Sequence, residues 1–116
     1  MSKSIDWLYH RNSCTTCKKA EAYREVAGTA VKETVIANKT KLGPVEALAL
    51  LKGIDKIVAA KGKKVETLNL KADKPDDATI LALIIGPTGK LRAPTAKVGK
   101  TLLVGFHEDA YAEVLG

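Results

Sequence analysis

Two cysteines, Cys14 and Cys17, have the residue type and spacing best suited to chemistry in this chain. They are its only cysteines, and two residues separate them. An apolar run at residues 5–9 precedes them and predicts a strand, whereas residues 18–27 have helical composition and stop at Gly28, a favourable residue after a helix. Two cysteines so spaced at a strand-to-helix junction are typical of a thiol–disulfide exchange site.

The expected geometry gives the two thiols different roles. Cys14 should lie at the helix N-terminus, where free N–H groups and the positive end of the helix dipole favour a thiolate. Arg11, Lys18 and Lys19 add positive charge nearby. Cys17 should share a face of the first turn with Cys14, within reach of a mixed disulfide. We therefore predict that Cys14 is the nucleophile and Cys17 the resolving thiol.

Two other interpretations of the cysteine pair stay open. The pair could form part of a zinc site with His10 as a third ligand, but a closed structural site usually needs four ligands and His107 is the only other histidine. The cysteines could also be inert core residues, since reduced cysteine often behaves as a small apolar side chain. The strand–helix context favours the redox interpretation, so we expect no bound metal.

Length and composition limit the fold and the partners. A chain of 116 residues is expected to form one domain, with an aliphatic core because only 4% of residues are aromatic. The net charge of +6 is compatible with an anionic substrate, with an acidic partner, or with a role in solubility alone. The lysines are scattered, so direct nucleic-acid binding is not expected.

Neither a membrane span nor a signal peptide is visible, which favours a cytoplasmic protein. Nothing in the sequence indicates an obligate oligomer, so we expect a monomer.

The rest of the chain predicts further helices and strands. Residues 65–70 are ambiguous, although Val65, Leu68 and Leu70 are expected to be buried. Pro94 directly precedes a predicted strand, a position where proline is tolerated, and it could be cis and place backbone groups beside Cys14. In order, the predicted elements are a strand at 31–37, helices at 45–52, 56–60 and 75–85, a hairpin of strands at 95–98 and 101–104 with a type II′ turn at 99–100, and a helix at 108–115.

Three blocks of the sequence together resemble one family, the glutaredoxin-dependent arsenate reductases (ArsC) and the related bacterial regulator Spx. The first and third blocks are fairly specific as a pair, and the resemblance covers nearly the whole chain. The blocks are Tyr9-His10-x-x-x-Cys14-x-x-Cys17-Lys18-Lys19-Ala20, then Gly53-Ile54-Asp55-Lys56-Ile57, and then Leu91-Arg92-Ala93-Pro94 followed by Leu103-Val104-Gly105-Phe106-His107-Glu108-Asp109.

The resemblance implies an α/β, thioredoxin-like fold over residues 1–116, with a mixed four-stranded sheet and a helical subdomain inserted at about 42–86. In the reductases, the cysteine that matches Cys14 attacks arsenate, three arginines bind the oxyanion, and glutathione and glutaredoxin release the arsenic. In Spx the two cysteines form an intramolecular disulfide switch, and the protein binds the C-terminal domain of the RNA polymerase α-subunit.

Several further residues receive expected roles from the resemblance. Lys61 falls near one of the reductase arginines and Arg92 lies one residue from a second, so both are candidates for oxyanion binding. The third position falls within 103–105, where no basic residue stands. His10, whose counterpart in the families is mainly an orienting residue, is a candidate for tuning the thiolate, as is Arg11 through its nearby charge, and Pro94 is the candidate active-site proline.

The expected function is therefore that of a thiol redox enzyme, either similar to arsenate reductases or a general thiol–disulfide oxidoreductase. It would need no bound cofactor, and glutathione, glutaredoxin or thioredoxin would be its electron donor. The alternative is an Spx-like redox switch that regulates transcription by binding RNA polymerase. A third interpretation is a thioredoxin-like binding domain in which Cys14 and Cys17 are incidental.

Overall fold

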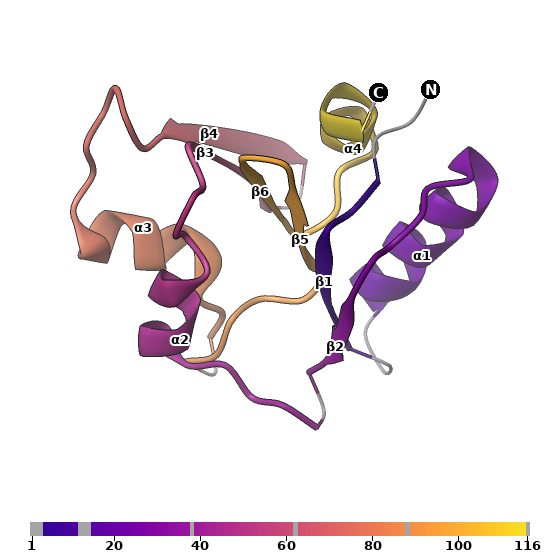
Figure 1. Ribbon diagram of the computed structural model, residues 1–116, viewed down its shortest axis with the longest axis horizontal. Coiled ribbons are helices and arrows are strands. Elements are labelled where there is room, and N and C mark those ends of the chain that lie inside the picture. The colour runs from indigo at the N-terminus through magenta and orange to yellow at the C-terminus, as the bar shows by residue number, and fades with distance from the viewer. Residues whose placement is uncertain (1–3, 12–14, 38, 62, 88, 116) are drawn as a thin grey trace.

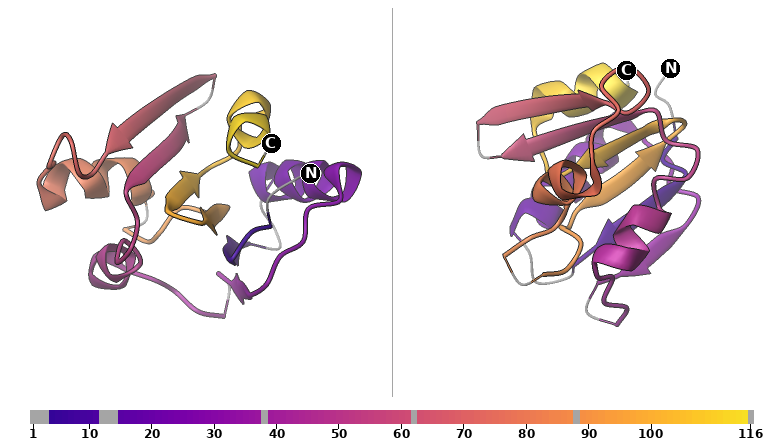
Figure 2. Two further views of the ribbon diagram at one scale, coloured as in Figure 1. Left: turned by 45° about the horizontal axis from the view of Figure 1, so that its top comes forward. Right: turned by 90° about the vertical axis from the view of Figure 1, so that its left-hand side faces the viewer.

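The computed structural model describes residues 4–11, 15–37, 39–61, 63–87 and 89–115. A six-stranded sheet lies between helices on both of its faces (Figures 1 and 2). The elements are β1 (Trp7–His10), α1 (Thr15–Ala27), β2 (Thr34–Ile36), α2 (Pro44–Ala49), β3 (Lys56–Lys61), β4 (Lys64–Asn69), α3 (Asp77–Ile84), β5 (Thr95–Val98), β6 (Thr101–Val104) and α4 (Glu108–Leu115).

The strand order is β2-β1-β5-β6-β3-β4. The β1–α1–β2 unit joins two parallel strands, while β5 pairs antiparallel with β1 and with β6. These four neighbouring strands form the mixed arrangement that the family resemblance implies. The expected number of four strands is wrong, however, because β3 pairs parallel with β6 and β4 pairs antiparallel with β3, which extends the sheet to six.

The helix predicted at 56–60 is instead the strand β3. Its residues Ile57, Val58, Ala59 and Ala60 are all buried, because the strand lies between β6 and β4 with helices over the sheet. A strand buried on both faces appears in the sequence as a continuous apolar run, which periodicity alone does not distinguish from a short buried helix. Residues 42–86 therefore contain two strands as well as the helices α2 and α3.

The ambiguous segment at 65–70 is largely the edge strand β4. Leu68 and Leu70 are partly buried, as the sequence predicts, and pack against the core. Val65 was expected to be buried, but 38% of it is exposed. Its position on the last strand of the sheet explains the difference, since an edge strand has a neighbour on one side only.

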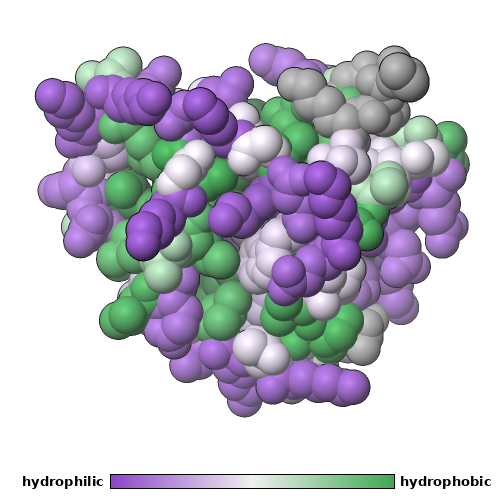
Figure 3. Space-filling view, viewed as in Figure 1, coloured by the Kyte–Doolittle hydropathy of each residue, from purple (hydrophilic) through white to green (hydrophobic). Residues whose placement is uncertain are grey.

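The two faces of the sheet carry separate hydrophobic cores. Leu8 of β1 belongs to the core under α1 and α4, whereas the next residue, Tyr9, belongs to the core under α2 and α3. This alternation follows from the two-residue repeat of a strand. Apolar side chains are also visible at the surface around α2 and α3 (Figure 3). Within the described ranges, no helix is long and apolar enough to cross a membrane.

The C-terminal part of the chain agrees with the sequence prediction. The strands at 95–98 and 101–104 and the helix at 108–115 have the predicted bounds. Gly99 has a φ of +59°, which is the conformation that the first central position of a type II′ turn requires. Two short extended segments separated by a two-residue turn with glycine first were therefore sufficient to predict this hairpin.

Candidate functional site

The junction between β1 and α1 is the first part of the candidate site. His10 ends β1, and Cys17 is the third residue of α1, in its first turn. The Cys17 side chain is completely buried, with 0% of the residue exposed. Cys14 lies outside the described residues, so its predicted place at the helix N-terminus and its low thiol pKa stay predictions.

Pro94 lies beside the end of β1, next to this junction. Tyr9 of β1 is paired with Thr95 of β5, so the residue before Thr95 lies at the level of His10. Pro94 is buried, and its peptide bond with Ala93 is cis. The Pro94 carbonyl accepts a hydrogen bond of 2.8 Å from the N–H of Gly105. The sheet therefore holds the Pro94 backbone close to the end of the strand that leads to the cysteines.

His10 and Arg11 differ in their surroundings. Only 8% of His10 is exposed, and its Nε2 lies 3.9 Å from Oε2 of Glu21 in α1. Its Nδ1 is buried without a hydrogen-bond partner among the described atoms. Arg11 is exposed. His10 is therefore held between β1 and α1, and its effect on the thiolate stays a prediction.

The guanidinium group of Arg92 is bound by the protein itself. Its Nη2 donates to the Ala60 carbonyl at 2.6 Å, and its Nη1 donates to the Leu83 carbonyl at 3.2 Å. Leu83 is near the end of α3, and the residue whose N–H would complete its helical hydrogen bond is Pro87, which has none. Partial burial lowers the pKa of Arg92 from its usual value, although an arginine stays charged at neutral pH. Arg92 therefore joins β3 to the end of α3.

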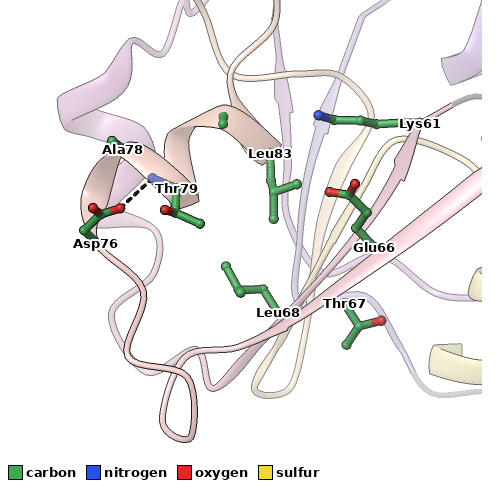
Figure 4. A pocket seen from close by; sticks show the side chains of 9 residues that line it. Lys61, Glu66, Thr67, Leu68, Asp76, Ala78, Thr79 and Leu83 are labelled. Carbon is green, nitrogen blue, oxygen red and sulfur yellow. Dashed lines mark hydrogen bonds between the residues drawn. The ribbon is translucent and has the colours of Figure 1, made fainter.

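Lys61 and Arg92, the two residues expected to bind an oxyanion, line different cavities. Lys61 and Glu66 line a cavity of about 730 Å³ between β4 and α3. Figure 4 shows both side chains extending toward this space, with Leu68 and Leu83 between them and the start of α3. Arg92 lines a second cleft of about 770 Å³.

This second cleft, which we call the basic cleft, lies at the end of β1. Among the described residues that line it, the charged ones are all basic, namely Arg11, Lys41, Lys90 and Arg92. A concave surface with charge of one sign concentrates ions of the opposite sign. Tyr9 also lines the cleft, and its hydroxyl donates to the Thr40 carbonyl at 2.6 Å and so fixes the neighbouring loop. The arrangement is suited to an anionic ligand.

Sequence reasoning did not identify Lys41 or Lys90 as parts of the basic cleft, and it named Gly105 only within the third block of the family resemblance. The two lysines are far apart in the chain and have no local motif, so only the fold brings them together. Gly105 has a φ of +76°, and a Cβ atom there would lie 2.9 Å from the Ala60 carbonyl oxygen and 3.0 Å from Nη2 of Arg92. Its signals in the sequence were its place in that block and its position directly after a predicted strand. Gly105 thus permits the contact between Arg92 and β3.

The burial of Cys17 leads us to predict different alkylation rates for the two cysteines. We expect an alkylating reagent to modify Cys14 much faster than Cys17 near neutral pH, because the Cys17 sulfur is inaccessible to the reagent in the folded protein. Mass spectrometry of peptides after timed alkylation would measure both rates. Unfolded protein is the control, in which the two rates should approach each other, and equal rates in folded protein would contradict the assignment.

No group of three or more histidine, cysteine, aspartate or glutamate residues lies together to hold a metal ion in the part of the chain described. The zinc interpretation also involves Cys14, which lies outside that part.

Comparison with known proteins identifies the family. Proteins named "Global transcriptional regulator Spx" from Enterococcus faecalis, Staphylococcus haemolyticus and Bacillus subtilis are 30%, 31% and 28% identical to this chain. Each alignment covers 88% of this chain and 80% of the relative. The sequence pattern of the ArsC family matches residues 9–114. The match covers most of the chain, and the α/β architecture with a mixed sheet agrees with it. The chain therefore belongs to the ArsC family, whose fold is thioredoxin-like.

Proposed function

We propose that this chain is a thiol redox protein in which Cys14 is the nucleophile and Cys17 the resolving thiol. The observation that carries the proposal is the placement of Cys17, fully buried in the first turn of α1 where β1 ends beside Pro94. A sulfur in the first helical turn is within reach of a partner three residues earlier, and burial shields it from other reactants.

The proposed reaction with a disulfide substrate has two steps. The Cys14 thiolate attacks one substrate sulfur, which forms a mixed disulfide and releases the other sulfur as a thiolate. Cys17, after losing its proton, attacks the Cys14 sulfur, releases the second substrate thiolate and closes the Cys14–Cys17 disulfide. The substrate gains two electrons, and an external thiol reductant such as glutathione, glutaredoxin or thioredoxin returns the protein to the dithiol.

The basic cleft supports an anionic substrate for this chemistry. It contains Arg92, one of the residues expected to bind an oxyanion, and it also contains Arg11, Lys41 and Lys90. However, Nη1 and Nη2 of Arg92 already donate hydrogen bonds to backbone carbonyls. The other three cations are exposed, so they would provide most of the attraction for an anion such as arsenate, the substrate that the family resemblance implies.

A redox-switch regulator is the alternative that a specific observation favours. The relatives described above are named as global transcriptional regulators. In this alternative the same Cys14–Cys17 disulfide would form, but its consequence would be altered binding to a protein partner. The resemblance implies that this partner is the α-subunit of RNA polymerase.

Parallel assays of one protein preparation separate the two functions. An enzyme should reduce a small disulfide or arsenate in the presence of glutathione and glutaredoxin, and Cys14→Ser should abolish turnover. A regulator should show no turnover, but its oxidised and reduced forms should bind the RNA polymerase α-subunit differently, and Cys17→Ser should remove that difference. Absence of turnover together with redox-independent binding would contradict both.

A further inference from the structure

Helix α1 buries a charged side chain on the face that it packs against the core. Its buried residues are Cys17, Ala20 and Arg24. Only 9% of Arg24 is exposed, and its Nη1 is buried without a hydrogen-bond partner among the described atoms. Burial of a cation is costly unless an anion or hydrogen-bond acceptors compensate for the lost water. The position of Arg24 therefore favours a nearby negative charge or acceptor that compensates for its burial.

The helix geometry directs Arg24 toward Cys17. The two residues are seven positions apart, which is close to two full turns, so they lie on the same face with an axial separation of about 10 Å. Side chains on a helix tilt toward its N-terminus, so an arginine stem in the last turn is expected to extend back toward the turn of Cys17. Ala20, the third buried residue of this face, lies between them in the sequence and has a small side chain.

Tyr111 of α4 shows that these groups share one buried environment. Its hydroxyl is buried and has no hydrogen-bond partner in the described part of the protein. Burial raises the pKa of Tyr111 well above its usual value, while the charge of Arg24 lowers it and that of Cys17 raises it. Both groups are therefore close enough to the phenol for their charges to act on it.

Cys17 is the group in this cluster that can balance the arginine. Tyr111 stays neutral at physiological pH because burial disfavours its phenolate. The ion pairs between described residues involve other groups, including Glu21 of α1, which lies near His10. A cysteine thiol has a usual pKa of about 8.5, which a nearby cation lowers.

We propose that the buried guanidinium of Arg24 stabilises negative charge on the Cys17 sulfur and so tunes the redox activity of the cysteine pair. This inference rests on the proposed function. When a thiol reductant transfers two electrons to the Cys14–Cys17 disulfide, the S–S bond breaks and Cys17 leaves as a thiolate, which Arg24 stabilises. In the opposite direction, the same charge helps Cys17 to lose its proton before it attacks the mixed disulfide. Because stabilisation of the reduced form raises a reduction potential, Arg24 makes the pair more oxidising.

The test replaces Arg24 by methionine, which keeps an unbranched stem and removes the charge. We expect the equilibrium between protein disulfide and glutathione to shift toward the protein disulfide by about tenfold or more, which corresponds to a potential about 30 mV more negative. Arg24→Lys keeps the charge and should shift the equilibrium much less. Lys32→Met is the matched control, since it removes one positive charge from an exposed side chain. An unchanged equilibrium in Arg24→Met would overturn the proposal.

A second measurement separates this proposal from the proposed function. In a Cys14→Ser background, the ultraviolet absorbance of the Cys17 thiolate should titrate at a pH about one unit higher after Arg24→Met, a tenfold weaker ionisation. This result does not depend on a disulfide. If the parent protein forms no Cys14–Cys17 disulfide, the proposed function fails, whereas an unchanged Cys17 titration refutes the role of Arg24.

The folding of the variant is a further control. Reduced Arg24→Met should be at least as stable as the parent, because replacement of a buried charge by an apolar side chain is often neutral or stabilising. If it does not fold, Arg24→Gln provides a second neutral side chain for the same two measurements. A loss of stability without a change in either measurement would show that Arg24 is only structural.

Discussion

Replacing Gly105 by alanine is expected to lower the free energy of unfolding by about 2–4 kcal/mol, the range of a strained and overpacked site. Two effects add in this variant. The φ of +76° disfavours any L-residue with a Cβ, and the new Cβ would lie 2.9 Å from the Ala60 carbonyl oxygen, closer than real Cβ atoms approach. Denaturant unfolding followed by circular dichroism would measure the loss.

Gly28→Ala is the matched control for this experiment. Gly28 has a φ of +68°, but a Cβ there would meet nothing within 4 Å. Its loss should therefore reflect backbone strain alone, about 1 kcal/mol. If both variants lose the same free energy of unfolding, the close approach of Gly105 to β3 and Arg92 does not contribute to the destabilisation.

Replacing Arg92 by alanine is expected to lower the free energy of unfolding by about 2–3 kcal/mol, because two charge-assisted hydrogen bonds to backbone carbonyls disappear. The loss is not larger because the arginine is only half buried. The Leu83 carbonyl would lose the donor that Pro87 does not provide. Lys90→Ala removes a charge from the same cleft without these bonds and should have little effect on stability. An equal loss in both variants would contradict the structural role of Arg92.

The same pair of variants tests the basic cleft. If the cleft binds an oxyanion, both Arg92→Ala and Lys90→Ala should weaken sulfate binding, measured by calorimetry at low salt. If Arg92→Ala weakens the free energy of sulfate binding by about 1.5–3 kcal/mol, Arg92 donates a direct charge-assisted hydrogen bond to the anion. Sulfate affinity that neither variant changes would exclude the cleft as an oxyanion site.

Local signals explain which parts of the fold the sequence could predict. The β5–β6 hairpin and α4 were predicted with their observed bounds, because Gly99 marks the turn and acidic residues mark the start of the helix. Strand β3 was predicted as a helix. Its two alanines favour a helix locally, and only its pairing with β6 and β4 makes it a strand.

The candidate site divides in a similar way. The positions of Cys17 in the first turn of α1 and of Pro94 at the start of β5 follow from sequence spacing. The basic cleft and the contact between Arg92 and Ala60 do not, since they join segments far apart in the chain. Burial of Arg24 was equally unpredictable, because a charged residue in an amphipathic helix is normally expected to face solvent.

The formation of a Cys14–Cys17 disulfide is the central claim of this account, and mass spectrometry of mildly oxidised protein tests it most directly. The intact monomer should lose the mass of two hydrogens, regain it with a thiol reductant, and yield a peptide in which Cys14 and Cys17 are linked. Cys17→Ser should prevent this change. Dimers linked through Cys14, with no loss of two hydrogens in the monomer, would contradict the account.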